Sequence, residues 1–89
     1  MIESTAILVN RAGLHARSSA KLVDVTTSYS SSIQVGLGDR FVDGKSILAL
    51  MMLAATKGCT LTLRANGDDE EAAVEAIKTL IAQGFGESD

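Results

Sequence analysis

The sequence has no proline and no tryptophan, and only three of its 89 residues are aromatic. Aliphatic side chains must therefore form the core, and nucleic-acid binding by base stacking on aromatic rings is excluded. The one cysteine, Cys59, cannot form an internal disulfide, so a cytoplasmic location and a buried, inert thiol are the default expectations. No apolar run reaches the ~20 residues of a membrane span and no signal peptide opens the chain, so we expect no membrane insertion.

The length of the chain limits what it can enclose. Eighty-nine residues predict a single domain, 1–89. A chain of this size buries only about 60–65% of its unfolded surface, which leaves little room for an enclosed substrate pocket of several hundred Å³. A carrier or binding module is favoured over a free-standing enzyme, and we expect neither a cofactor nor a metal.

Charge is distributed unevenly along the chain. Seven Lys and Arg accompany four Asp and Glu through residue 65, whereas one Lys accompanies seven acids in 66–89. The basic part suits acidic protein partners, but it is too sparse for nucleic acid. In the acidic part, Asp68 and Glu71 have the spacing of a capping box at the start of a helix. The acidic residues at 68–71 therefore have a sufficient structural role, and no metal-binding or catalytic carboxylate is predicted among them.

Hydrophobic periodicity predicts the element order β-α-β-β-α-β-α. The expected strands lie near 3–9, 33–37, 40–42 and 59–65, and the expected helices near 16–27, 47–56 and 69–83. This order indicates an α+β fold with helices on one face of a mainly antiparallel sheet. The first strand is apolar on both faces, which predicts a central position in the sheet.

The first two helices differ in pattern. Helical spacing predicts one buried face for the first, made of Ala16, Ala20, Val23 and Thr27. The second is apolar nearly all round and is expected to end at Lys57-Gly58. Because a small domain cannot bury it completely, we expect one face in the core and one in a binding surface.

The segment 10–17 carries the chemistry. Gly13 permits a sharp turn, and His15, the only histidine, falls at the start of the first predicted helix. Unpaired backbone N–H groups there attract anions, and Arg17 adds a guanidinium suited to phosphate. Together these features indicate a transferable phosphoryl group. The alternative is a capping or surface histidine without chemistry.

Electrostatics supports the phosphoryl interpretation. The helix dipole disfavours the imidazolium ion by ~0.3–1 kcal/mol, which leaves a neutral, nucleophilic ring. After phosphorylation the same dipole favours the bound anion, and Arg17 adds roughly 1.5–3 kcal/mol. Interactions of this size stabilise a phosphohistidine and still allow its phosphoryl group to be passed on.

Residues 13–17, Gly-Leu-His-Ala-Arg, with residues 43–47, Asp-Gly-Lys-Ser-Ile, resemble the HPr family, the histidine phosphocarriers of the bacterial phosphoenolpyruvate-dependent phosphotransferase system. The resemblance covers nearly the whole chain. It implies an open-faced β-sandwich: a four-stranded antiparallel sheet covered on one face by three helices. It also implies that His15 Nδ1 takes a phosphoryl group from enzyme I and passes it to enzyme IIA components. Arg17 and the backbone N–H groups of Ala16 and Arg17 would cradle it, and a monomer is expected.

Ser46 is predicted to cap the second helix. The resemblance makes it the target of an HPr kinase/phosphorylase in lineages that carry that enzyme. A phosphate there would repel partners from the expected docking surface, which consists of Ala20, Lys21, Lys45, Ile47, Leu48 and Met51. Residues 44–46 are not part of a nucleotide-binding loop, because position 39, where that motif needs glycine, is Asp.

The chain departs from the family in two places. Ser18-Ser19 replaces the usual Pro-Ala, so the turn is either looser or held by a hydrogen bond from Ser18. Ala54 stands where many relatives have glycine and is expected only to stiffen the second helix. Two alternative functions remain. One is a regulatory binding protein acting through Ser46. The other is a paralogue of the nitrogen-related phosphotransferase branch, because the C-terminal segment 84–87 resembles the C-terminal tails of that branch.

Overall fold

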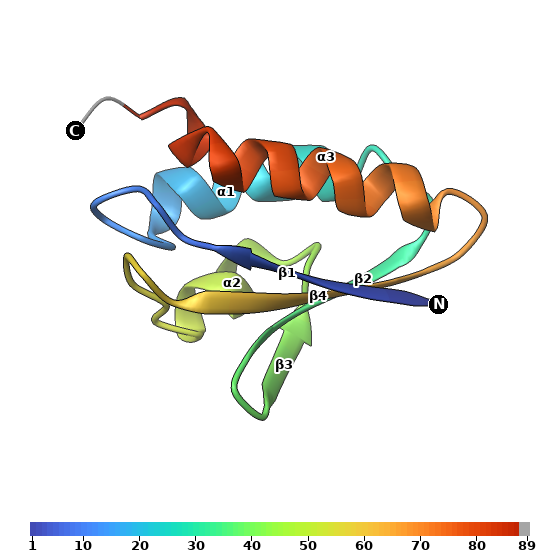
Figure 1. The fold of residues 1–89 in the computed structure, drawn as a ribbon, viewed down its shortest axis with the longest axis horizontal. Helices are drawn as coiled ribbons and strands as arrows, with labels where there is room; N and C mark the ends of the chain where they lie inside the picture. Colours follow the sequence, from blue (N-terminus) through green and yellow to red (C-terminus); the bar gives the residue numbers. More distant parts are fainter. Residues whose placement is uncertain (88–89) are drawn as a thin grey trace.

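The computed structural model describes residues 1–87 as a four-stranded sheet with three α-helices (Figure 1). The strands are β1 (Ile2–Ile7), β2 (Ser32–Leu37), β3 (Arg40–Asp43) and β4 (Thr60–Asn66). The helices are α1 (Ala16–Thr26), α2 (Ile47–Met52), α3 (Glu70–Ala82) and the short 3₁₀ helix η1 (Gly84–Gly86). All pairings are antiparallel, in the order β1-β4-β2-β3, which confirms the predicted fold class.

β1 lies at an edge of the sheet, and the prediction of a central strand was wrong. Within residues 1–87 it pairs only with β4, with Ile7 opposite Thr60. Ile7 is 57% exposed and Val9 45% exposed, whereas Leu8 between them is buried. Apolar residues on both faces of this strand therefore do not mean two buried faces, because one face of an antiparallel sheet can remain in solvent.

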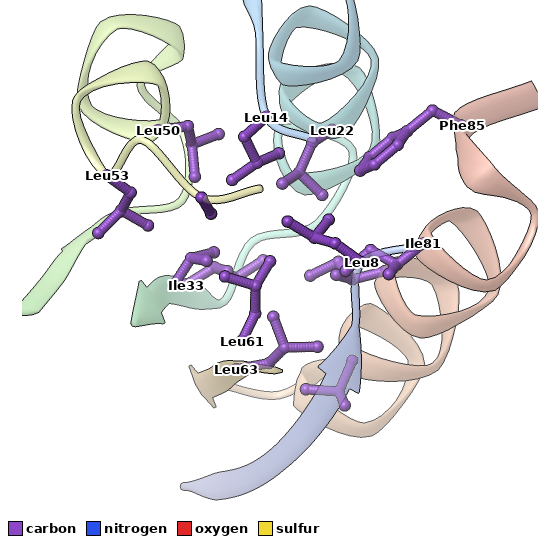
Figure 2. Close-up of a cluster of buried hydrophobic side chains, with 14 of the residues drawn as sticks. Leu8, Leu14, Leu22, Ile33, Leu50, Leu53, Leu61, Leu63, Ile81 and Phe85 are labelled. Atoms are coloured by element: carbon purple, nitrogen blue, oxygen red, sulfur yellow. The ribbon is translucent and has the colours of Figure 1, made fainter. Parts of the chain in front are cut away.

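A single aliphatic core joins the sheet to the helices (Figure 2). Leu22 of α1, Leu50 of α2 and Ile81 of α3 meet Leu61 and Leu63 of β4 in this core. All five side chains are fully buried. The three helices therefore bury apolar residues against the same sheet.

The buried face of α1 is not the predicted one. Its buried residues are Ser18, Ser19, Leu22 and Thr26. Ala16 and Thr27 are exposed instead. Thr26 Oγ1 donates to the backbone oxygen of Gly44 at 2.8 Å. A hydrophobicity pattern does not predict this face, because three of its four buried residues carry hydroxyl groups. Those of Ser18 and Thr26 are buried where a carbonyl oxygen accepts their hydrogen bond.

α2 is shorter than predicted and ends at Met52. Ala54 has φ 54°, in the left-handed region, so it ends the helix rather than stiffening it, and Lys57-Gly58 is not the helix stop. The physical reason is tertiary: the chain turns at 53–56 so that the Ala55 carbonyl accepts a hydrogen bond from Leu14 N at 3.0 Å.

α3 begins one residue later than predicted, with Asp69 at its N-cap, and Asp68 and Glu71 do not form the expected capping box. The Asp69 carboxylate accepts hydrogen bonds from the backbone N–H groups of Ser30 and Ser31 at 2.9 and 3.0 Å. A hydrogen bond from the Ser31 hydroxyl is the main cause that lowers the pKa of Asp69 to about 2. Asp69 therefore connects the loop before β2 to the start of α3.

Ala54→Gly is expected to stabilise the protein by about 0.5–1 kcal/mol, because glycine adopts φ > 0 without the Cβ clash that alanine meets there. Thermal unfolding would show a midpoint higher by a few degrees. Ala72→Gly, on the exposed side of α3, is the matched control and should destabilise by a similar amount. A lower midpoint for Ala54→Gly would contradict the left-handed conformation.

Candidate functional site

A tight turn between β1 and α1 positions the site. Asn10 is buried, and its Nδ2 donates to the Gly13 oxygen at 2.9 Å. Gly13 has φ 67°, and a Cβ placed there would lie 2.3 Å from the Ala55 oxygen. Leu14, buried in the core, follows directly. Only glycine fits this approach, and the turn then places His15 at the start of α1.

His15 is the N-cap of α1, with an extended backbone at φ −119° and ψ −172°. The first helical hydrogen bond runs from Ser19 N to the His15 oxygen at 2.9 Å. Arg17 N donates to Nδ1 of the ring at 3.3 Å. Because 34% of the His15 side chain is exposed, a partner can reach the ring.

Ser18 supplies the hydrogen bonds that hold this helix start. Its Oγ accepts from His15 N at 3.0 Å and donates to the Gly13 oxygen at 2.7 Å. The Ser18 hydroxyl accepts from His15 N, and the His15 imidazole accepts from Arg17 N, so two backbone N–H groups at the helix start are satisfied by side chains. The alternative in which Ser18 bonds at the helix start is confirmed, and the turn is not left loose by the absence of proline.

Glu87 also reaches the site, which the sequence analysis did not predict. Glu87 Oε2 lies 2.9 Å from His15 Nε2, and Glu87 Oε1 accepts from Asn10 Nδ2 at 3.0 Å. The hydrogen bond from Asn10, followed by the contact with His15, lowers the pKa of Glu87 below its ordinary value. Lys21, predicted to lie in the docking surface, donates from Nζ to the Phe85 oxygen at 2.7 Å. Sequence spacing gives no signal for contacts that join residues more than 60 positions apart.

Two donors near the ring remain available. Within residues 1–87, the backbone N–H of Ala16 has no hydrogen-bond partner and the Arg17 guanidinium has no ion-pair partner. Both residues are exposed. Free donors beside a nucleophilic nitrogen can bind the oxygens of a phosphoryl group.

Ser46 caps α2, accepting a hydrogen bond from Ala49 N at 3.2 Å, as predicted. Lys45 turns toward the neighbouring loop, where its Nζ donates to the Tyr29 oxygen at 2.9 Å. We define the α2 patch as the exposed apolar side chains of this helix, which are 38–67% exposed: Ile47, Leu48, Met51 and Met52. The sequence analysis missed Met52, and Ala20 of the predicted docking surface is half-buried.

Other kinds of site find no support in residues 1–87. No group of three or more His, Cys, Asp and Glu side chains is placed to bind a metal ion in this range. None of the helices in the same range has the length and apolar character needed to span a bilayer.

Ser18→Ala is expected to lower the free energy of unfolding by about 1–2 kcal/mol, because it leaves the buried Gly13 oxygen and His15 N–H with fewer partners. Urea denaturation would measure the loss. Ser28→Ala removes one exposed hydroxyl bond at the other end of α1 and should cost less than half as much. Equal losses in the two variants would show that Ser18 does not hold the helix start.

Comparison with known proteins agrees with this geometry. A family model described as "PTS HPr component phosphorylation site" matches residues 2–83. Phosphocarrier protein HPr of Cupriavidus necator is 43% identical over 89 residues, and phosphocarrier protein NPr of Shewanella violacea is 33% identical over 87 residues. These alignments cover the whole of this chain and of the first relative, and 98% of this chain and 96% of the second.

The fold comparison gives the same result. The crystal structure of HPr-C-His from Thermoanaerobacter tengcongensis is similar with a TM-score of 0.95 and 40% identity, over the whole of both chains. The family model, the relatives and the solved structure all match this chain over most or all of its length. The chain belongs to the HPr family of phosphocarrier proteins of the phosphotransferase system.

Proposed function

We propose that this protein acts in the cytoplasm as a one-domain carrier, 1–89, that relays a phosphoryl group from enzyme I to enzyme IIA components through His15. It is an intermediate in transfer rather than a free-standing enzyme, and it uses neither cofactor nor metal. The observation that carries the proposal is a partly exposed imidazole at a helix N-terminus, with Nδ1 directed at the backbone amides. A histidine that only capped the helix would not need the free donors beside it.

The proposed transfer needs only the groups around the ring. The Nδ1 lone pair attacks phosphorus, a P–N bond forms, and the bond from phosphorus to enzyme I breaks. Arg17 N, which lies at the long limit of hydrogen bonding to Nδ1, then faces a phosphoryl oxygen instead. The Ala16 N–H and the Arg17 guanidinium complete the cradle, and the α1 dipole favours the new anion. In the second transfer a nucleophile of enzyme IIA attacks phosphorus, the P–N bond breaks, and its electron pair returns to Nδ1.

The comparisons favour this function over the alternatives. The identity to HPr of Cupriavidus necator is higher than the identity to NPr of Shewanella violacea, which supports the main branch over the nitrogen branch. The exposed ring and its free donors also argue against a regulatory protein in which His15 has lost its role.

We infer that the α2 patch docks enzyme I and enzyme IIA. It is apolar and exposed, and α2 packs against α1, whose first residues carry the proposed chemistry. Ser46 lies directly before this patch, so a phosphate on its hydroxyl would place about two negative charges beside the apolar contacts. Phosphorylation by an HPr kinase/phosphorylase is the proposed regulation.

His15→Ala should abolish formation of an acid-labile phosphoprotein when the chain is mixed with enzyme I and phosphoenolpyruvate. Arg17→Ala should slow transfer roughly tenfold to hundredfold, because it removes one charge-assisted hydrogen bond. Rapid-quench measurement with labelled phosphoenolpyruvate would give both results. Arg64→Ala, which removes an arginine from the sheet, is the control and should transfer normally. An adduct that survives His15→Ala would end the proposal.

Leu48→Asp and Ser46→Asp should each raise KM for transfer from phospho-enzyme I by roughly tenfold, because each places a charge in the proposed contact. The rate at saturation should change little, since neither residue touches His15. Asn66→Asp adds the same charge at the opposite end of the sheet and serves as the control. An unchanged KM in both variants would place the docking surface elsewhere.

A further inference from the structure

Glu87 is held against the His15 ring by the segment 84–87, which follows α3. After α3, Gly84 and Phe85 adopt φ values of 62° and 59°, which turn the backbone toward α1. The Phe85 side chain is 1% exposed and packs in the core, and its carbonyl oxygen accepts from Lys21 Nζ at 2.7 Å. The Glu87 side chain is consequently only 13% exposed. Its carboxylate position follows from core packing.

Asn10 determines which carboxylate oxygen faces His15. Its Nδ2 donates to two acceptors, the Gly13 oxygen at 2.9 Å and Glu87 Oε1 at 3.0 Å. Two acceptors on one nitrogen fix the orientation of the amide, because the amide oxygen cannot take its place. Glu87 Oε1 is therefore occupied, and Oε2 is left to accept from the imidazole at 2.9 Å.

The hydrogen bonds of His15 require one ring nitrogen to accept and the other to donate. Arg17 N–H points at Nδ1, which must accept, while the Glu87 carboxylate faces Nε2, which must donate. Hydrogen bonds at one nitrogen set the protonation of the other. Both contacts therefore specify the same tautomer, with the proton on Nε2 and the lone pair on Nδ1.

We propose that Glu87 is a positioning residue that holds His15 as the Nε2–H tautomer and so selects Nδ1 as the phosphoryl acceptor, with Asn10 orienting the carboxylate. This inference rests on the proposed relay through His15. It gives a functional role to residues 10 and 87, which family resemblance did not assign.

The proposed role has a direct consequence for the transfer step. As the Nδ1 lone pair forms the P–N bond, positive charge develops on the ring, and the proton already on Nε2 stays there. The Glu87 carboxylate stabilises this imidazolium, as an acidic residue does for histidine in other transfer sites. When the P–N bond breaks, its electron pair returns to Nδ1 and no proton has to move. The carboxylate thus serves both directions of the relay.

The single histidine of the chain makes the test direct, because the ¹⁵N shifts of Nδ1 and Nε2 belong to one ring. At alkaline pH, where the ring is neutral, wild type is expected almost wholly as the Nε2–H tautomer. Glu87→Ala should lower the ratio of Nε2–H to Nδ1–H by about tenfold, the effect of one charge-assisted hydrogen bond. The rate of phosphoryl transfer from enzyme I should fall by a similar factor.

Glu87→Gln gives a sharper result. The glutamine oxygen must serve Asn10 Nδ2, so the glutamine NH₂ group faces Nε2 and favours a lone pair there. We expect this variant to hold less Nε2–H tautomer than Glu87→Ala, although glutamine preserves the size of the side chain. Glu75→Gln, an exposed change on α3 that removes the same charge, should behave as wild type.

The outcomes separate this inference from the relay itself. A tautomer ratio within twofold of wild type in both Glu87 variants would overturn the positioning role, even if His15 is phosphorylated. A shifted ratio with an unchanged transfer rate would overturn the claim that the tautomer matters for transfer. If wild type accepts no phosphoryl group, the relay fails, and the tautomer measurement still decides what Glu87 does to the ring.

Discussion

The contact between the turn at 10–14 and the loop at 53–56 is the constraint on which the candidate site depends. Leu14 N donates to the Ala55 oxygen, and Gly13 approaches the same carbonyl so closely that no other residue fits. This contact fixes where α1 begins and therefore where His15 lies. It also explains why α2 stops at Met52, since a longer helix would carry Ala55 away from the turn. The start of α1, which carries the proposed site, and the length of α2 are thus set together.

The helix start shows how one local device can replace another. Proline in a first helical turn restricts φ and removes an unpaired N–H, whereas Ser18 leaves the backbone free and binds it through a hydroxyl. That hydroxyl connects His15 N to the Gly13 oxygen, so the turn before the helix and the N-cap are joined by one side chain. Because Ser18 is buried, solvent does not compete for these bonds. A chain without proline can therefore keep an ordered helix start around His15, the proposed phosphoryl acceptor.

The positions of individual charged residues matter more in this protein than its net charge. The C-terminal part is acidic, yet its carboxylates have separate tasks. Asp69 holds the loop before β2, and Glu87 faces the His15 ring on the side away from Nδ1. A negative group at Nε2 leaves Nδ1 and its donors open to an incoming anion. Meanwhile Arg17 keeps its guanidinium in solvent, where a phosphoryl group can meet it.

The sequence alone determined the order of the elements, the N-cap at Ser46 and the place of His15 at a helix start. Each of these depends on neighbours in the chain: alternation, turn residues and capping residues. Residues 13–17 and 43–47 were also sufficient to indicate the family, because motif spacing survives in sequence. The buried face of α1 was harder to predict, since Ser18, Ser19 and Thr26 look polar in sequence. Only the structure shows the carbonyl oxygens that accept hydrogen bonds from Ser18 and Thr26.

Only the tertiary structure decided which strands lie at the edges, where α2 ends and what surrounds the His15 ring. β1 is an edge strand because the chain crosses back to place β4 beside it, a choice that its own apolar pattern does not encode. Ala54 takes a left-handed conformation because the loop must reach the turn at Gly13. Glu87 meets His15 across 72 positions of sequence because Phe85, two residues before it, packs in the core. Long-range packing sets these contacts, and no local pattern of residues reports it.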